Sequence, residues 1–164
     1  MTFSIDIQND SNYLIDATRL QAASQQVLSQ HDVDPDTTLS IVFVDNAYIQ
    51  NVNRQFRGFD SPTDVLSFPA DEPPVQIDGE PPYLGDLIIA YPYASEQAAR
   101  EGHTLDDNLS LLVVHGTLHL LGYDHDTPEN RAEMWAAQDA ALTELGISTA
   151  IVPALEGGDH DQPH

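Results

Sequence analysis

The sequence predicts a single α+β domain in which a mixed sheet of about four strands is packed with helices. The chain has 164 residues, which is the size of one domain. Short apolar segments that predict strands alternate with longer segments that predict helices. Because neither an internal repeat nor a domain boundary is evident, we expect residues 1–150 to form one domain. Residues 151–164 are polar and are expected to be a disordered tail.

Four segments have the composition of strands. Residues 3–7 alternate apolar and polar side chains, which is typical of a strand with one buried face. Residues 39–44 are almost continuously apolar and rich in β-branched side chains, as expected of a central strand covered on both faces. Residues 65–68 and 84–90 are the third and fourth predicted strands, and a proline follows each of them closely.

Five other segments predict helices. Their starts carry side chains that can cap a helix, and Thr127 followed by Pro128 is the clearest of these signals. Residues 71–82 are rich in proline and acid and have no periodicity, so we expect an exposed loop there. The predicted helices cover approximately residues 17–28, 46–57, 94–100, 105–121 and 127–146.

The composition limits the possible partners and ligands. The net charge is −22, and the five basic residues are all arginines. Such a surface repels nucleic acid and anionic membranes at long range, so a polyanionic substrate must meet local positive charge or a metal ion. Adaptation to a salty cytosol, or solubility, also accounts for the acidic charge. The chain has no cysteine, which leaves His, Asp and Glu as possible metal ligands.

The sequence shows no sign of export or of a membrane span. Its first residues lack a basic region followed by an apolar one, and no later apolar segment approaches the length of a transmembrane helix. We therefore expect a cytoplasmic protein without membrane contact.

Three histidines have the spacing of a metal site. His115 and His119 are four residues apart in the fourth predicted helix, so both imidazoles leave the same face. A straight helix would carry His125 about 240 degrees past His119 and about 9 Å further along. Gly122 resolves this problem, because glycine tolerates the left-handed conformation that ends helices and lets the chain fold His125 back. The metal site is thus expected at a helix C-terminus.

Three imidazoles around one ion leave a fourth position for water, which is the arrangement of catalytic zinc. The sequence therefore predicts a metallohydrolase with one Zn²⁺ per chain. The spacing also resembles the zinc helix of metzincin peptidases. Those enzymes carry a general-base Glu directly after the first His, whereas this chain has Gly116. A peptidase would lack its proton acceptor, while phosphoryl transfer is unaffected.

The remaining histidines are interpreted differently. His31 and His103 lie at predicted helix ends, and His160 and His164 lie in the tail. We expect all four on the surface.

The segment His115–His125, HGTLHLLGYDH, resembles the signature of the YbeY family of bacterial ribosomal RNA maturation factors. Two further blocks resemble that family in the same order: residues 57–69, RGFDSPTDVLSFP, and residues 84–88, LGDLI. The resemblance extends over nearly the whole chain to about Gly146. The histidine block is too specific to be a chance match.

The resemblance implies a zincin-like α+β fold and a single-strand-specific endoribonuclease in ribosomal RNA processing and ribosome quality control. It implies zinc on His115, His119 and His125, RNA as substrate, and the ribosome or its proteins as partners. It also implies that His115 is a catalytic residue as well as a ligand. Arg57 matches the family's functional arginine, and a guanidinium can bind two phosphate oxygens and stabilise developing charge.

Several residues keep alternative interpretations. Arg57 could be a surface arginine in a turn, and Asp86 and Asp124 could either orient a ligating imidazole or be ordinary loop acids. Met134 and Trp135 are interpreted as core residues. Gln138 stands where the family commonly has Glu, which weakens any role for a carboxylate there.

Two other functions remain open at this point. One is a metal-dependent hydrolase of amide or peptide bonds. The other is a non-catalytic ribosome assembly factor with a structural ion. Independently of this choice, five arginines without lysine cannot hold RNA by broad charge neutralisation.

Overall fold

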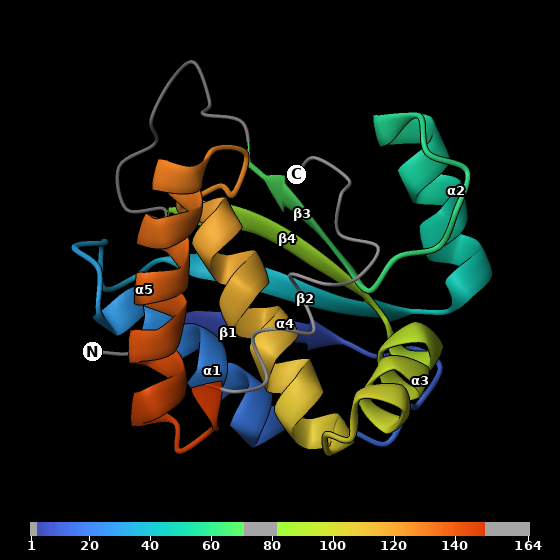
Figure 1. Cartoon of the computed structure of the whole chain (residues 1–164), viewed down its shortest axis with the longest axis horizontal. Helices are drawn as coiled ribbons and strands as arrows, with labels where there is room; N and C mark the ends of the chain where they lie inside the picture. Colours follow the sequence, from blue (N-terminus) through green and yellow to red (C-terminus); the bar gives the residue numbers. More distant parts are fainter. Residues whose placement is uncertain (1–2, 71–81, 150–164) are drawn as a thin grey trace.

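The computed structural model describes residues 3–70 and 82–149 and shows a four-stranded mixed sheet (Figure 1). The strands are β1 (Ser4–Gln8), β2 (Thr38–Val44), β3 (Val65–Pro69) and β4 (Tyr83–Ala90). Their order in the sheet is β1-β2-β4-β3. β1 pairs with β2 and β2 with β4 in parallel, whereas β3 pairs with β4 in antiparallel orientation. The α+β fold predicted from the sequence, with its four-stranded mixed sheet, is confirmed.

The helices are α1 (Ala17–Ser29), α2 (Asn46–Arg57), α3 (Tyr91–Glu101), α4 (Leu105–Leu120) and α5 (Pro128–Glu144). Side-chain oxygens of the residues just before α1, α2, α4 and α5 accept hydrogen bonds from backbone N–H groups in the first turn. The predicted start of α3 near residue 94 is wrong, because the helix begins at Tyr91. Pro92 lies in its first turn, where no N–H group is needed.

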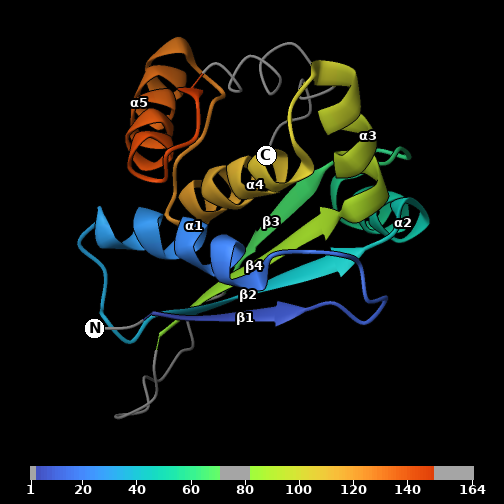
Figure 2. The ribbon, with the colours of Figure 1, turned by 90° about the horizontal axis from the view of Figure 1, so that it is seen from below.

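The helices are arranged on both sides of the sheet. Figure 2 shows α1, α4 and α5 together on one side of the strands. The apolar side chains of α2, Ile49 and Val52, form a second, smaller core with Leu66 of β3 and Ala90 at the end of β4. α1 and α4 therefore cover one face of the sheet, α5 packs on these two helices, and α2 partly covers the other face.

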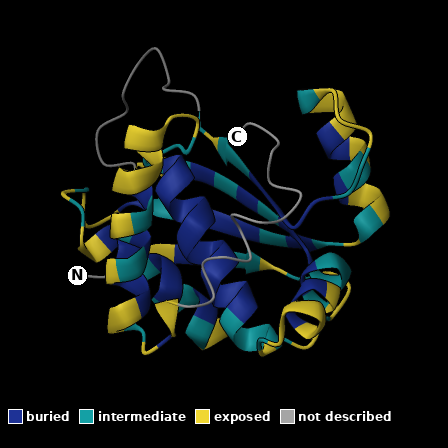
Figure 3. Ribbon diagram, in the orientation of Figure 1, coloured by how far each residue is buried: buried dark blue, intermediate teal, exposed yellow. Residues whose placement is uncertain are grey.

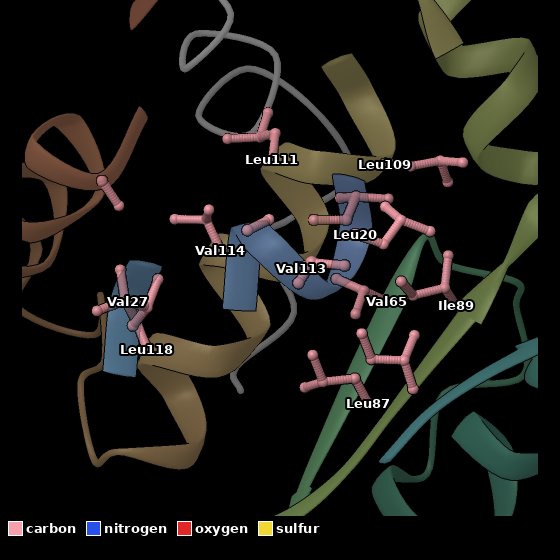
Figure 4. Packing of buried hydrophobic residues seen from close by; sticks show 14 of the residues in the cluster. Leu20, Val27, Val65, Leu87, Ile89, Leu109, Leu111, Val113, Val114 and Leu118 are labelled. Atoms are coloured by element: carbon pink, nitrogen blue, oxygen red, sulfur yellow. The ribbon is translucent and has the colours of Figure 1, made fainter. Parts of the chain in front are cut away.

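The main core is built around α4. Every residue of this helix from Asn108 to Leu120 is buried, and Figure 3 shows the helix in dark blue along most of its length. A helix that is apolar on all sides belongs in the interior of a domain rather than on its surface. Figure 4 shows Val113 and Leu118 of α4 among side chains of α1 and of the two strands β3 and β4, including Leu20 and Leu87.

Two expectations lie outside the described residues. They are the exposed loop, of which residues 71–81 are not described, and the disordered tail, residues 151–164. Within the described ranges, no helix is long and apolar enough to span a bilayer.

Gly85 allows β3 and β4 to pair closely, and its replacement by Ala tests this. A Cβ atom at residue 85 would lie 2.3 Å from the backbone oxygen of Phe68, and the φ angle is +144°. We expect Gly85→Ala to lower the free energy of unfolding by about 3 kcal/mol or more. Urea titration measures this loss.

Gly102→Ala is the matched control. Gly102 also has a positive φ, +77°, but among the described residues nothing lies within 4 Å of its Cβ position. We expect Gly102→Ala to lower the free energy of unfolding by only about 1 kcal/mol, which is the cost of the left-handed backbone. Equal losses for the two variants would show that the contact with Phe68 has no special importance.

Candidate metal centre

The last turns of α4 bring two imidazoles together. His115 and His119 project from the same face of the helix because they are four residues apart. Their ring centroids are 4.6 Å apart, and their Nε2 atoms are 3.1 Å apart. Both residues are buried, so little of either imidazole is exposed to solvent.

A sharp turn after α4 adds the third imidazole. Gly122 has a φ of +104°, and the N–H of Tyr123 donates to the carbonyl of Leu118, which closes the end of the helix. The His125 ring consequently lies 5.6 Å from that of His115 and 5.2 Å from that of His119, between centroids. One nitrogen from each ring lies within 4.8 Å of the other two. The predicted convergence of three histidines at a helix C-terminus is confirmed.

Hydrogen bonds fix the tautomers of two of these rings. Nδ1 of His115 lies 3.0 Å from Oε1 of Gln138, and Nδ1 of His119 lies 2.9 Å from the carbonyl oxygen of Tyr123. Both oxygens can only accept, so each Nδ1 carries the proton and each Nε2 presents a lone pair. Two lone pairs that face each other at 3.1 Å repel unless a cation lies near both. The donor set therefore fits a divalent metal ion.

The titration of His119 also suits a ligand. Burial, followed by the nearby His125, lowers the pKa of His119 to about 4. The imidazole is thus neutral around pH 7, which is the form that binds metals. Metal binding at neutral pH does not have to displace a proton from this ring.

Residue 116, where metzincin peptidases carry their general base, is closely packed against side chains of the sheet. A Cβ atom on Gly116 would lie 2.7 Å from Cδ2 of Leu87 and 3.3 Å from Oγ of Ser67. A Glu side chain at this position of α4 would collide with β3 and β4. A side chain at residue 116 would therefore require Leu87 and Ser67 to move.

Arg57 is the last residue of α2 and is partly buried. Burial lowers the pKa of its guanidinium, and the charge of Asp124 acts in the opposite direction. The charge of Arg57 in turn contributes to the lowered pKa of His119. The structure thus places Arg57 within electrostatic reach of the histidines, although it lies on a different element.

Asp124 and Asp86, whose roles the sequence leaves open, lie in different surroundings. Asp124 accepts a hydrogen bond from the backbone N–H of His125 at 2.8 Å, and it borders a pocket of about 200 Å³ together with His119, Gly122, Ser67 and Pro69. Asp86 lies on β4 and accepts a hydrogen bond from the hydroxyl of Tyr83. The first acid thus belongs to the turn that carries His125.

His31, which the sequence predicts to lie on the surface, is partly exposed and holds two hydrogen bonds. Its Nδ1 lies 2.7 Å from the carbonyl of Val27, which only accepts, so Nε2 accepts from the hydroxyl of Tyr123 at 3.0 Å. Tyr123 also accepts from His119 through its carbonyl. The end of α1 is thereby joined to the turn of the metal centre, through a contact between residues 92 positions apart.

Two residues of α5 complete the surroundings of the centre. Trp135 packs edge-on against His115 and His125, with centroids 5.9 and 5.7 Å away, so it is a wall of the site as well as part of the core. Met134 is fully buried, as expected. Gln138 differs from the Glu that the family commonly has at this position, and it contacts His115. Nothing in the sequence indicated this contact.

Gln138 is expected to hold His115 in its ligating orientation. We predict that Gln138→Met, which keeps the volume and removes the acceptor, weakens metal affinity roughly 10- to 100-fold. Gln138→Glu restores an acceptor and should restore affinity. A competition titration with a chromogenic chelator measures both values. Unchanged affinity in Gln138→Met, with the fold intact, would show that the hydrogen bond does not orient the ligand.

Comparison with known proteins agrees with this geometry. The family described as "Endoribonuclease YbeY" matches residues 5–146. "Endoribonuclease YbeY" of Geobacillus thermodenitrificans is 42% identical over 156 residues, which cover 90% of this chain and 99% of that protein. The Mycobacterium tuberculosis protein of the same name is 36% identical over 164 residues, covering 97% and 90%.

A solved structure shows the same fold. The solution structure of TM1509 from Thermotoga maritima superposes with a TM-score of 0.54 at 24% identity, covering 98% of this chain and 99% of that one. The family match over most of the chain and the identities to its members together show that this protein belongs to the YbeY family.

Proposed function

We propose that the protein is a zinc-dependent endoribonuclease that cleaves single-stranded RNA in ribosomal RNA maturation and ribosome quality control. The observation that carries this proposal is the cluster of His115, His119 and His125 beside Arg57 in a member of this family. We further propose that it acts in the cytoplasm on ribosomal RNA, with the ribosome or its proteins as partners. Residues 1–150 would form the single catalytic domain.

Zinc is the proposed ion, with one bound per chain. Three imidazoles without a thiolate match catalytic zinc sites, in which a fourth position stays open. When bound, such an ion acts as a Lewis acid on a phosphoryl oxygen and makes water more acidic.

The residues of the chain supply positioning and charge. Arg57 would bind the oxygens of the scissile phosphate and stabilise the negative charge that develops on them. We propose His115 as a catalytic residue as well as a ligand, since its ring is held by Gln138 and enclosed by Trp135. The pocket bordered by His119, Ser67 and Pro69 gives an RNA strand access beside edge strand β3.

Hydrolysis of peptide or amide bonds is the alternative activity. Gly116 argues against the peptidase mechanism, because the residue after His115 carries no carboxylate that could act as the general base. A non-catalytic assembly factor would bind the ribosome without cleaving RNA or peptide.

One experiment separates the three functions. The zinc-loaded protein is incubated with labelled single-stranded RNA, with the same RNA as a duplex, and with an unstructured polypeptide. We expect cleavage of the single strand alone, and we expect His119→Ala to abolish it because a ligand is lost. Cleavage of the polypeptide with intact RNA would support the amide hydrolase. Absence of both reactions would support the assembly factor.

Replacing Arg57 should separate phosphate binding from metal binding. We predict that Arg57→Ala lowers the rate of RNA cleavage roughly 100-fold or more, while zinc affinity and fold persist, because Arg57 supplies charge but no ligand. Arg57→Lys should recover only part of the activity, since an ammonium cannot bind two oxygens in the planar way of a guanidinium. Wild-type kcat and KM in Arg57→Ala would remove this residue from the mechanism.

A further inference from the structure

We propose that Phe56 and Phe59, on either side of Arg57, form a platform on which bases of single-stranded RNA stack next to the metal centre. This inference rests on the proposed function and names a binding surface for its substrate. We call Phe56, Phe59, Arg54 and Arg57 the α2 platform.

The first argument is the exposure of apolar rings. Phe56 and Phe59 are 69% and 36% exposed, although burial of an aromatic ring is strongly favourable. Phe56 is not a disordered surface residue, because its ring packs edge-on against Phe68 of β3 with centroids 5.6 Å apart. The ring is therefore held in place by Phe68 while most of its surface stays exposed.

The second argument is local charge. The chain carries 27 acidic residues, yet residues 46–59 contain no Asp or Glu. Two of the five basic residues, Arg54 and Arg57, lie in the last turn of α2. The guanidinium of Arg57 lies 5.8 Å from the ring centroid of Phe59. Phosphates of an RNA strand thus meet positive charge here at the same place where its bases meet aromatic rings.

The third argument is position. Phe68, which supports Phe56, precedes Pro69, and Pro69 borders the pocket that also contacts His119. Figure 1 shows the end of α2 on the same side of the molecule as the end of β3 and the end of α4. A strand that enters the metal centre can therefore continue along the edge of β3 onto the platform.

Aromatic rings combined with arginines favour single strands over duplexes. In an unpaired strand the base faces can stack on aromatic side chains, whereas in a duplex they are covered by neighbouring pairs. Every base has such a face. A stacking platform therefore distinguishes single strands from duplexes but does not distinguish one RNA sequence from another. Because the chain has few cations, stacking is the main source of affinity that this surface offers.

Binding is measured by fluorescence anisotropy with a short, unstructured, labelled RNA and the full chain in the presence of a chelator, which prevents cleavage. We expect Phe56→Ala with Phe59→Ala to weaken affinity roughly tenfold or more, and Phe59→Ala alone roughly fivefold. Tyr replacements at both positions should retain affinity, and Leu replacements should not, because Leu is apolar but has no ring face. A sugar-phosphate strand without bases should bind the wild type and the double variant equally.

Tyr48→Ala is the matched control. Tyr48 is an exposed aromatic residue, 56% accessible, in the first turn of the same helix, away from Arg57. Its loss should leave RNA affinity unchanged. Thermal unfolding verifies that each variant is folded. If Phe56→Ala disturbs the packing on Phe68, the RNA affinity of the single variant Phe59→Ala tests the platform.

The outcomes separate the platform from the proposed function. Wild-type affinity in the double variant, or full recovery with Leu, would overturn the platform even if the protein cleaves RNA. If the wild type neither binds nor cleaves RNA, both inferences fail together. A protein partner on the same surface would appear as RNA binding that none of the Phe variants changes.

Discussion

The close approach of α4 to the sheet determines where the nitrogens of the metal centre lie. At Gly116 the backbone of the helix is so near β4 that a Cβ atom would be 2.7 Å from Leu87, and the hydroxyl of Ser67 donates to the Gly116 carbonyl at 3.3 Å. A helix buried on all sides has no freedom to turn about its axis, so the directions of His115 and His119 are fixed by the core. A carboxylate at the position that peptidases use would have to displace the side chains of Leu87 and Ser67. One packing constraint thus both builds the histidine pair and limits the chemistry open to it.

Around this helix, two elements contact the centre and a third anchors the first turn of α4. α5 provides Gln138 against His115, α1 provides His31 against Tyr123, and the loop before β3 provides Asp64. Asp64 is completely buried and accepts from Gln97 of α3 at 3.2 Å, and Gln97 accepts from Asn108 of α4 at 3.1 Å. Asp64 also accepts from the backbone N–H of Val65, so it joins the start of β3 to α3 and, through Gln97, to α4. Buried polar groups that are linked in this way make each element's position depend on the others.

Local signals in the sequence were sufficient for the elements and for the cluster of three histidines. Alternating and continuous apolar segments located four strands, capping residues located most helix starts, and the four-residue spacing with Gly122 located the three histidines. The start of α3 was misplaced because Pro92 ends a strand and begins a helix equally well. The contacts of His31, Gln138 and Arg57 could not be predicted, since they join residues far apart in sequence. Their side chains have no feature that distinguishes a supporting residue from an ordinary surface residue until the fold brings the elements together.

The grouping of Arg54 and Arg57 at the end of α2 has a consequence for the conditions under which RNA can be held. Each phosphate that a protein cation neutralises on a single strand contributes about −0.7 to the dependence of log affinity on log salt concentration. Two such contacts give a slope of only about −1.4, far shallower than for nucleases with extensive basic surfaces. Rising ionic strength also screens the repulsion between RNA and the acidic remainder of the chain, which offsets part of this loss. An acidic protein built in this way can bind RNA over a wide range of ionic strength.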